Sequence, residues 1–539
     1  SKHILQRASL KINNIYKSEF NLVCRRRAIR TGMIATSLSI LVLTDYAFAL
    51  NILGIYPYQG KSHFFIFRIY LRELAKRGHN VTVISHFPES DAPPNYHDIR
   101  LAGSIEAIEE TTPFHNSYLM VLLDGYYLAT GGTENCEVML ANKQVQGLIK
   151  DKPKFDVVVV EQFNSDCALG IAYKLQAPVV GMMSHILMPY HYKRLGVPNN
   201  PAYVSFHFLE GGTKPTLIQR VERVIFDFYF RSMYYFLCQR VDQNTLAQYF
   251  DDIPPLEDLA ADIKFLLVYH NFILTGSRLF PSNVIEVGGY HVALPKPLTS
   301  DLKKFFDEAE HGVVYISFGS VVKASSMSAD QVQIMLKVMD QLPQKFIWKW
   351  EDPSLKYDKN KLFIASWLPQ VDILAHPKTL AFLSHAGNGG TTEAIHYGVP
   401  LVAMPVVGDQ PANAAAIEES GLGVQLHIRN LNIENLSNAF KKVIDPGTKV
   451  KELSSAWHDR PMSPLDTAVF WTEFAARHSN FTFRTAAADV PLYQHMNLDI
   501  AIVFITIFLI VFIPFFRIVL SICRRSSVNK TKVIKKKRK

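Results

Sequence analysis

The chain has 539 residues, more than one hydrophobic core usually holds, so two or three domains are expected. Hydrophobic residues make up 48% and charged residues 19% of the chain, a composition that excludes intrinsic disorder. The net charge of +9 lies at the two ends: ten Lys or Arg and no acid occur from Ile500 on, and residues 1–32 carry a net +7, which leaves about −8 for the body. This distribution argues against a nucleic-acid-binding face.

The N-terminal residues are typical of a secretory signal. Met33–Leu43 is a short apolar run, the basic stretch Cys24–Arg30 precedes it, and Ala47–Ala49 fits the small-x-small cleavage rule. We expect residues 1–49 to comprise an upstream extension and a signal peptide, with Met33 as a hypothetical natural start. A buried helix is the alternative.

The body alternates short apolar runs with helical patterns, which predicts parallel sheets covered by helices. We expect an α/β fold of two Rossmann-like domains, residues 50–290 and 300–490, joined by the Pro-containing linker Tyr290–Ser300. Ligands of such sheets bind at the carboxyl ends of the strands, here in a cleft between the domains. The expected strands are Asn51–Tyr58, Val81–Phe87, Phe155–Val160, Val179–Met183, Val313–Phe318, Lys345–Trp350, Leu362–Ser366, Leu380–Ser384 and Leu401–Pro405.

Residues 195–250 differ from the rest because aromatic and basic side chains mix there, most densely in Arg220–Cys238. They predict helices that form an acceptor pocket or a membrane-facing surface, with ordinary core packing as an equal alternative. The five cysteines form no CxxC pair and no regular spacing, so we expect neither a disulfide framework nor a zinc site.

Ser366–Asn413 carries the strongest chemical signal in the chain. Trp367 offers a flat face on which a base can stack, a contact worth about 1–3 kcal/mol. Gln370 can both donate and accept hydrogen bonds. A Gly-rich turn follows His385, and a helix expected to open at Thr391 would turn its free N–H groups toward a diphosphate.

The order Trp-x-Pro-Gln, His-Pro, His-x-Gly, Glu, Gly-Val-Pro and Asp-Gln over this stretch resembles the signature of the UDP-glycosyltransferase family. The segments Pro281–Gly289 and Val313–Ser320 also resemble the family, and the likeness extends from about residue 50 to the tail. It implies a GT-B fold, a UDP-sugar as donor substrate, no further cofactor and no metal. The donor-binding residues that it implies are Gly319, Ser320, Trp367, Gln370, His385, Gly387, Gly389, Gly390, Glu393, Asp409 and Gln410.

The sequence departs from the family pattern just after His385, where Ala386 replaces a glycine. If the backbone needs a positive φ there, the methyl group costs on the order of 1 kcal/mol. Gly389 and Gly390 further loosen the loop, so we expect weaker donor binding than is usual.

The predicted catalytic base is His63, which follows the first strand at the start of a helix. Its ordinary pKa of about 6.5 suits a general base, and Ser62-His63 matches the family's catalytic Ser-His. The family pairs this His with an Asp after a later strand. Here Glu161 stands at that position, and Asp166 is the alternative partner.

The C-terminal region predicts a membrane anchor. Residues 500–523 are long enough to span about 30 Å of hydrocarbon, and the basic tail 524–539 would stay in the cytosol. Lys536 and Lys537 match a dilysine retrieval signal, so we expect a single-pass type I protein of the endoplasmic reticulum with a lumenal body. The sequons at Asn80, Asn435 and Asn480 predict a glycoprotein, although Asn80 is expected to be rather buried.

Together these features predict inverting transfer of a sugar from a UDP-sugar to a hydroxyl of a small lipophilic acceptor. Val159–Cys167 resembles insect members of the family, which favours glucose. The alternatives are a catalytically weak protein that binds nucleotide-sugars or lipophiles at the membrane, and a transferase dedicated to one lipid. No nucleic-acid partner is expected, and a homo-oligomer is left open.

Overall fold

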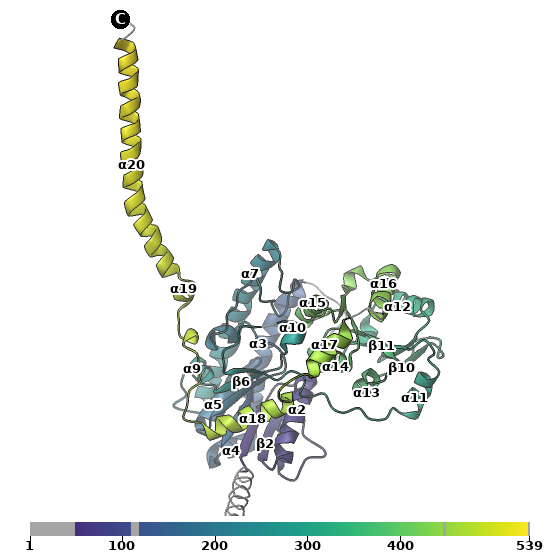
Figure 1. The fold of residues 1–539 in the computed structure, drawn as a ribbon. Coiled ribbons are helices and arrows are strands. Elements are labelled where there is room, and N and C mark those ends of the chain that lie inside the picture. Colours follow the sequence, from purple (N-terminus) through teal and green to yellow (C-terminus); the bar gives the residue numbers. More distant parts are fainter. Residues whose placement is uncertain (1–48, 109–117, 277, 446–448, 537–539) are drawn as a thin grey trace, which may run out of the picture. The chain divides into compact units, whose positions relative to one another are not determined.

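The computed structural model describes residues 49–108, 118–276, 278–445 and 449–536, with only the backbone described from 525 on. The predicted signal peptide therefore lies almost entirely outside the described residues. Two sheets, both wholly parallel, organise the body (Figure 1).

The first sheet has seven strands in the order β3-β2-β1-β4-β5-β6-β7. The central strand β4 is VVVVE and all five of its residues are buried, as expected for a strand covered by helices on both faces. The strands are β1 (Asn51–Tyr56), β2 (Asn80–Ser85), β3 (Tyr96–Arg100), β4 (Val157–Glu161), β5 (Val179–Met183), β6 (Phe265–Val268) and β7 (Val284–Glu286). The short strands β3, β6 and β7 were not predicted.

The second sheet has six strands in the order β10-β9-β8-β11-β12-β13. Its strands are β8 (Val313–Ser317), β9 (Lys345–Lys349), β10 (Leu362–Ala365), β11 (Thr379–Ser384), β12 (Leu401–Ala403) and β13 (Gly423–Gln425). Five of them fall on predicted runs, and β13 was not predicted. The expected two-sheet α/β architecture is confirmed.

Helices connect and cover the strands of both sheets. Those that follow the strands of the first sheet are α2 (Lys61–Lys76), α3 (Tyr118–Ala141), α4 (Lys143–Asp151), α5 (Cys167–Lys174), α6 (His191–Arg194), α7 (Leu217–Met233), the π-helical turn Tyr234–Gln239, α8 (Arg240–Ala247), α9 (Leu256–Ala261) and α10 (Phe272–Thr275). Those of the second half are α11 (Ser300–Asp307), α12 (Ala329–Gln341), α13 (Gln370–Leu374), α14 (Asn388–Tyr397), α15 (Gln410–Ser420), α16 (Ile433–Ile444), α17 (Val450–His458), α18 (Pro464–Arg477) and α19 (Leu492–His495).

Helix α18 does not stay with the second sheet, where the boundary at residue 490 would place it. It packs against α2 and the strands β4, β5 and β6 of the first sheet. The Tyr70 hydroxyl lies 2.6 Å from the Thr472 hydroxyl, and Phe265 packs against Trp471 and Phe483. The first domain is therefore discontinuous in sequence, because the chain crosses back to it before the C-terminal helix.

A disulfide joins Cys136 of α3 to Cys167 of α5, contrary to the expectation from cysteine spacing. Both cysteines are buried among apolar side chains of the first domain. A disulfide of this kind persists in oxidising compartments such as the lumen of the endoplasmic reticulum.

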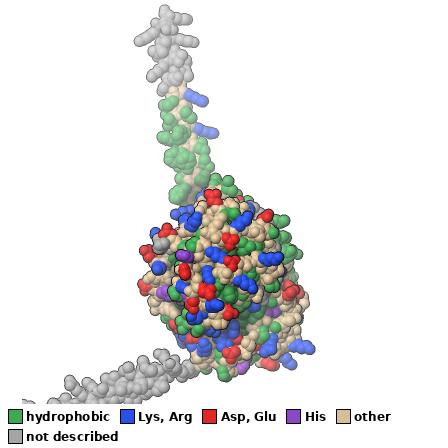
Figure 2. Space-filling view, turned by 90° about the vertical axis from the view of Figure 1, so that its right-hand side faces the viewer, with side chains coloured by type: hydrophobic (Ala, Val, Ile, Leu, Met, Phe, Trp, Pro, Cys, Tyr) green, Lys and Arg blue, Asp and Glu red, His purple; other side chains and the backbone are tan. Residues whose placement is uncertain are grey.

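The C-terminal helix α20 (Leu498–Lys536) contains a stretch, Leu498–Arg524, whose mean hydropathy of 2.8 and length suffice to cross a membrane. Pro514 lies within this stretch. Figure 2 shows hydrophobic side chains along the visible face of the C-terminal helix, between the body and the part that is drawn in grey. The three sequon asparagines, Asn80 included, are all exposed.

Candidate active site

One cavity of about 1030 Å³ is lined by residues that follow strands of both sheets. Tyr58 and His63 follow β1, Phe163 follows β4, Gly319 follows β8 and His385 follows β11. This is the sheet edge at which parallel α/β folds bind ligands. All eleven predicted donor-binding residues and His63 line the cavity, whereas Glu161 and Asp166 are buried outside its lining.

His63 and Glu161 form a hydrogen-bonded pair at the wall of the cavity. His63 lies in the first turn of α2, and Glu161 is the last residue of the neighbouring strand β4. The His63 Nδ1 atom lies 2.8 Å from Glu161 Oε1. The rings of Tyr58 and Phe163 pack against the imidazole with centroids 4.8 and 4.6 Å away, which fixes its orientation.

Burial dominates the protonation of this pair. It raises the pKa of Glu161 to about 8, with a hydrogen bond from the Tyr58 backbone acting the other way. It also lowers the pKa of His63 to about 4, partly offset by the negative charge of Asp409. Two groups this close titrate as a unit. When the pair loses its shared proton, the carboxylate accepts from Nδ1–H and leaves Nε2 free to take a proton.

Asp166, the alternative partner, takes no part in this contact. Its Oδ1 accepts a hydrogen bond from Arg194 Nη1 at 2.9 Å, and its Oδ2 accepts one from Gln239 at 3.2 Å. Both charged side chains are almost fully buried. Asp166 therefore holds helices of the first domain together, and Glu161 is the carboxylate that meets His63.

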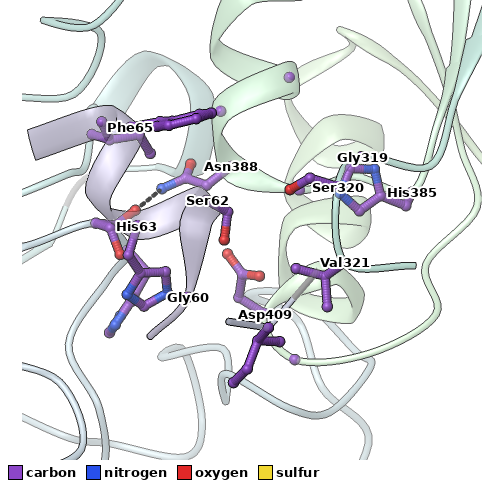
Figure 3. A pocket seen from close by; sticks show the side chains of 18 of the residues that line it. Gly60, Ser62, His63, Phe65, Gly319, Ser320, Val321, His385, Asn388 and Asp409 are labelled. Carbon is purple, nitrogen blue, oxygen red and sulfur yellow. Dashed lines mark hydrogen bonds between the residues drawn. The ribbon is translucent and has the colours of Figure 1, made fainter. Parts of the chain in front are cut away.

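Asp409 reaches the cavity from the second domain. Figure 3 shows its carboxylate and the Ser62 hydroxyl turned toward one another. Asp409 accepts a hydrogen bond from Asn413 at 2.8 Å, and burial raises its pKa. The side-chain amide oxygen of its neighbour Gln410 accepts hydrogen bonds from two backbone N–H groups of the preceding turn, at 2.8 and 2.9 Å. That oxygen therefore holds the turn.

The His385 ring is wedged between two glycines. An added Cβ would lie 2.3 Å from its Nε2 at Gly387 and 2.7 Å from it at Gly319, so neither position has room for a side chain. Burial lowers the pKa of His385 to about 4, which keeps the ring neutral. Ala386 has a φ of +63°, so the backbone at this position does have the positive φ that the sequence analysis considered. Its methyl group is fully buried.

Helix α14 begins at Asn388, three residues before the predicted start, and Gly387 is its N-cap. Gly389 and Gly390 therefore lie inside its first turn, where free backbone N–H groups favour an anion. The side-chain amide of Asn388 donates to the backbone oxygens of Ser184 and Tyr269, 3.3 and 3.1 Å away. This residue, missed in the sequence, links the donor loop to the first domain.

A hydrogen-bond chain runs from the first domain to Glu393. The Tyr269 hydroxyl lies 2.5 Å from His291 Nδ1, and His291 Nε2 lies 3.2 Å from Glu393 Oε1. Glu393 Oε2 accepts from Gln370 at 2.7 Å, and Gln370 Oε1 accepts from the Tyr315 hydroxyl at 3.2 Å. Glu393 is thus held from two sides and keeps further lone pairs for ligand hydroxyls. His291, in the linker, was not predicted.

Trp367 and Lys349 complete the donor side. Trp367 is 58% exposed, unusual for so large a ring and suited to stacking on a base. The Lys61 ammonium lies 5.5 Å from its centroid. Lys349, at the end of β9, is buried, pairs with Glu351 at 3.1 Å and lines the cavity. It lies near enough to His385 to lower that pKa, so it adds positive charge where a diphosphate is expected.

The fold matches solved GT-B glycosyltransferases. The calicheamicin glycosyltransferase CalG4 aligns with a TM-score of 0.53 at 16% identity, covering 80% of this chain and 100% of that one. A UDP-glucosyltransferase from Polygonum tinctorium aligns with a TM-score of 0.52 at 15% identity, covering 79% of this chain and 98% of that one. These likenesses define the class of fold.

The sequence comparisons are more specific. Residues 53–537 match the family described as UDP-glucoronosyl and UDP-glucosyl transferase. UDP-glucosyltransferase 2 of Dactylopius coccus is 34% identical over 500 residues, 90% of this chain and 94% of that protein. UDP-glucuronosyltransferase 1A3 of Homo sapiens is 30% identical over 471 residues, 82% of this chain and 86% of that protein. The chain therefore belongs to this family and is a glycosyltransferase that uses a UDP-sugar.

Proposed function

We propose that this chain transfers glucose from UDP-glucose to a hydroxyl of a small lipophilic acceptor, with inversion at the anomeric carbon. The observation that carries the proposal is the His63–Glu161 pair, 2.8 Å apart, in the wall of the cavity that all the predicted donor-binding residues also line. The base and the donor site thus belong to one compartment.

In the proposed step the acceptor oxygen attacks the anomeric carbon of an α-linked UDP-sugar. The bond from that carbon to the phosphate oxygen breaks, UDP leaves with the electron pair, and the hydroxyl proton passes to His63 Nε2. The carboxylate of Glu161 accepts from Nδ1–H and stabilises the imidazolium that forms, as in other His–carboxylate pairs. The product is a β-glycoside.

The diphosphate is proposed to lie against the first turn of α14, near Lys349 and His385. Backbone N–H groups and one ammonium would meet its charge, and no metal or other cofactor is invoked. Trp367 would stack on uracil, and Glu393 would accept from the ribose hydroxyls.

Glucose is favoured over glucuronate by the insect UDP-glucosyltransferase among the relatives, whose name states its donor class. The cation found in the cavity, Lys349, is paired with Glu351 and lies on the diphosphate side. A glucuronate carboxylate would need a positive partner of its own on the sugar side of the cavity.

We also propose that the body lies in the lumen of the endoplasmic reticulum and that the protein is a single-pass type I membrane protein. The spanning stretch Leu498–Arg524 and the basic residues after it support this orientation. The Cys136–Cys167 disulfide adds independent support because the lumen is oxidising.

The test is acceptor-dependent release of UDP by the detergent-solubilised full chain. UDP-glucose and UDP-glucuronate would be compared over a panel of phenols, steroids and lipids, with His63→Ala beside the native protein. Release with UDP-glucose that is lost in His63→Ala is the expected result. UDP-sugar binding without turnover would favour the alternative of a catalytically weak binding protein, and turnover of a single lipid would favour a dedicated lipid transferase.

A further inference from the structure

Helix α7 exposes a row of large apolar side chains that ordinary folding would bury. Six of its residues are more than half exposed, among them Ile218 at 72% and Phe228 at 70%. We call this set the α7 face; it consists of Leu217, Ile218, Val221, Val224, Ile225 and Phe228. Contiguous exposed apolar surface of this kind marks an interaction site.

The α7 face has the geometry of a helix that lies flat on a lipid surface. At about 100° per residue its six side chains fall within an arc of about 120°. Arg220 and Arg231, both exposed, lie along one edge of that arc. An apolar arc flanked by Arg is typical of helices that lie in the headgroup region of a bilayer.

Helix α3 extends the α7 face sideways. It packs beside α7 (Figure 1), and the Tyr229 hydroxyl of α7 donates to the Leu122 backbone oxygen at 2.6 Å. Leu119 is 65% exposed, and Tyr126 and Tyr127 are 47% and 61% exposed. Tyrosines with an apolar body and a polar tip are enriched where membranes meet water.

The same helix leads into the cavity. Met120, Asp124, Tyr127 and Leu128 of α3 line it, so Tyr127 belongs both to the exposed surface and to the cavity wall. An apolar molecule moving along α3 would therefore pass from the exposed surface to the compartment of His63. Asp124 is the acid of α3 in that wall, and burial raises its pKa to about 6.

We propose that the α7 face and the exposed side chains of α3 rest in the headgroup and upper acyl region of a lipid bilayer, and that lipophilic acceptors enter the cavity from the lipid along α3. A bilayer is the favoured occupant because the chain carries its own membrane-spanning stretch, which keeps the body beside lipid. The arginines at the edge of the arc and the tyrosines beside it fit headgroups. The second part of the proposal rests on the proposed transfer to a lipophilic acceptor; the first part does not.

The first part is tested by spin labels on the full chain in phosphatidylcholine vesicles, in a background where the exposed Cys523 is replaced by Ser. Val224→Cys reports on the α7 face, and Lys337→Cys, exposed on α12, is the control. We expect the Val224 label to collide preferentially with oxygen, which concentrates in lipid, and the Lys337 label with an aqueous nickel chelate. The proposal would be overturned if the nickel chelate reached the Val224 label as readily as the Lys337 label. It would also be overturned if both reagents failed to reach the Val224 label and the particle had twice the expected mass, since a second copy of the chain would then cover the α7 face.

The second part is tested by Ile218→Asp/Phe228→Asp, with Gln333→Asp/Lys337→Asp on α12 as the matched control. We expect the α7 variant to raise KM for a phenol dissolved in the bilayer about tenfold, with KM for UDP-glucose unchanged. An unchanged KM for the phenol would refute the route from the lipid. Absence of turnover in the native protein would count against the proposed function alone, because the label experiment needs no activity.

Discussion

Replacing His291 with Ala would remove the only linker side chain that the described structure places against Glu393. The lost contact is the hydrogen bond from His291 Nε2 to Glu393 Oε1, 3.2 Å long. The Glu393 carboxylate fixes the tautomer, since it can only accept and so requires hydrogen on Nε2, which leaves Nδ1 to accept from the Tyr269 hydroxyl. Glu393 would still be held by Gln370.

The magnitude follows from one hydrogen bond to a charged group, about 1.5–3 kcal/mol. Because the bond exists with and without nucleotide, this energy sets only the upper limit of the loss, a binding weaker by at most about 10- to 150-fold. We expect most of this loss in the Kd for UDP and in KM for the UDP-sugar, with kcat changed little, because the contact lies at the expected ribose site and away from His63. His291→Gln, which can still donate to the carboxylate, should recover much of the affinity.

The assay is calorimetric titration with UDP and with 2′-deoxy-UDP, which needs no acceptor. Native protein should prefer UDP, and His291→Ala should lose much of that preference, since a poorly placed Glu393 cannot accept from the ribose hydroxyl. His311→Ala, in the turn before β8, is the control. An unchanged Kd for UDP in His291→Ala, or an equal loss for both nucleotides, would refute the reasoning.

Three further predictions concern the base, the stacking platform and the disulfide. The pKa of Glu161 is raised to about 8, so the His63–Glu161 pair keeps its shared proton below that pH. In a pH–rate profile, kcat/KM should therefore rise with pH and level off above about 8. Glu161→Gln should lower kcat about 100-fold and abolish this rise. Trp367→Ala should raise KM for the UDP-sugar about tenfold through lost stacking, whereas Tm should hold because the ring is 58% exposed; a large fall in Tm would mean that the ring is structural. Cys136→Ala/Cys167→Ala should destabilise the first domain by about 2–4 kcal/mol, visible as a lower Tm, and alkylation before and after reduction should show two protected thiols in the native protein.

Much of the site could be predicted because parallel strands bring their carboxyl ends together. Glu161 was assigned because it stands where the family has an Asp. The structure explains the match, because a residue just past β1 and one at the end of β4 lie close when the two strands are neighbours. His385 and Gly319, both assigned from the family resemblance, lie beside each other for the same reason, since β11 pairs with β8.

What could not be predicted lies where no periodicity carries information. His291 stands in a linker without a strand or helix pattern, and Asn388 reaches across to backbone atoms of another domain. The pairing of Cys136 with Cys167 depends on the fold bringing one residue of α3 close to the first residue of α5, which their spacing of 31 residues does not reveal. The return of α18 to the first sheet likewise depends on tertiary packing alone.

Ala386 shows why the departure from the family pattern falls where the fold can accommodate it. Its methyl group packs in the apolar core of the second domain, its N–H donates to the Ser384 hydroxyl at 3.1 Å, and its carbonyl accepts from Asn413 at 3.0 Å. These contacts can offset a positive φ that costs on the order of 1 kcal/mol. At Gly387 and Gly319 a methyl group would instead collide with the His385 ring. The His385 ring, which lines the cavity where the diphosphate is proposed to lie, therefore depends on those two glycines and not on the position that Ala386 occupies.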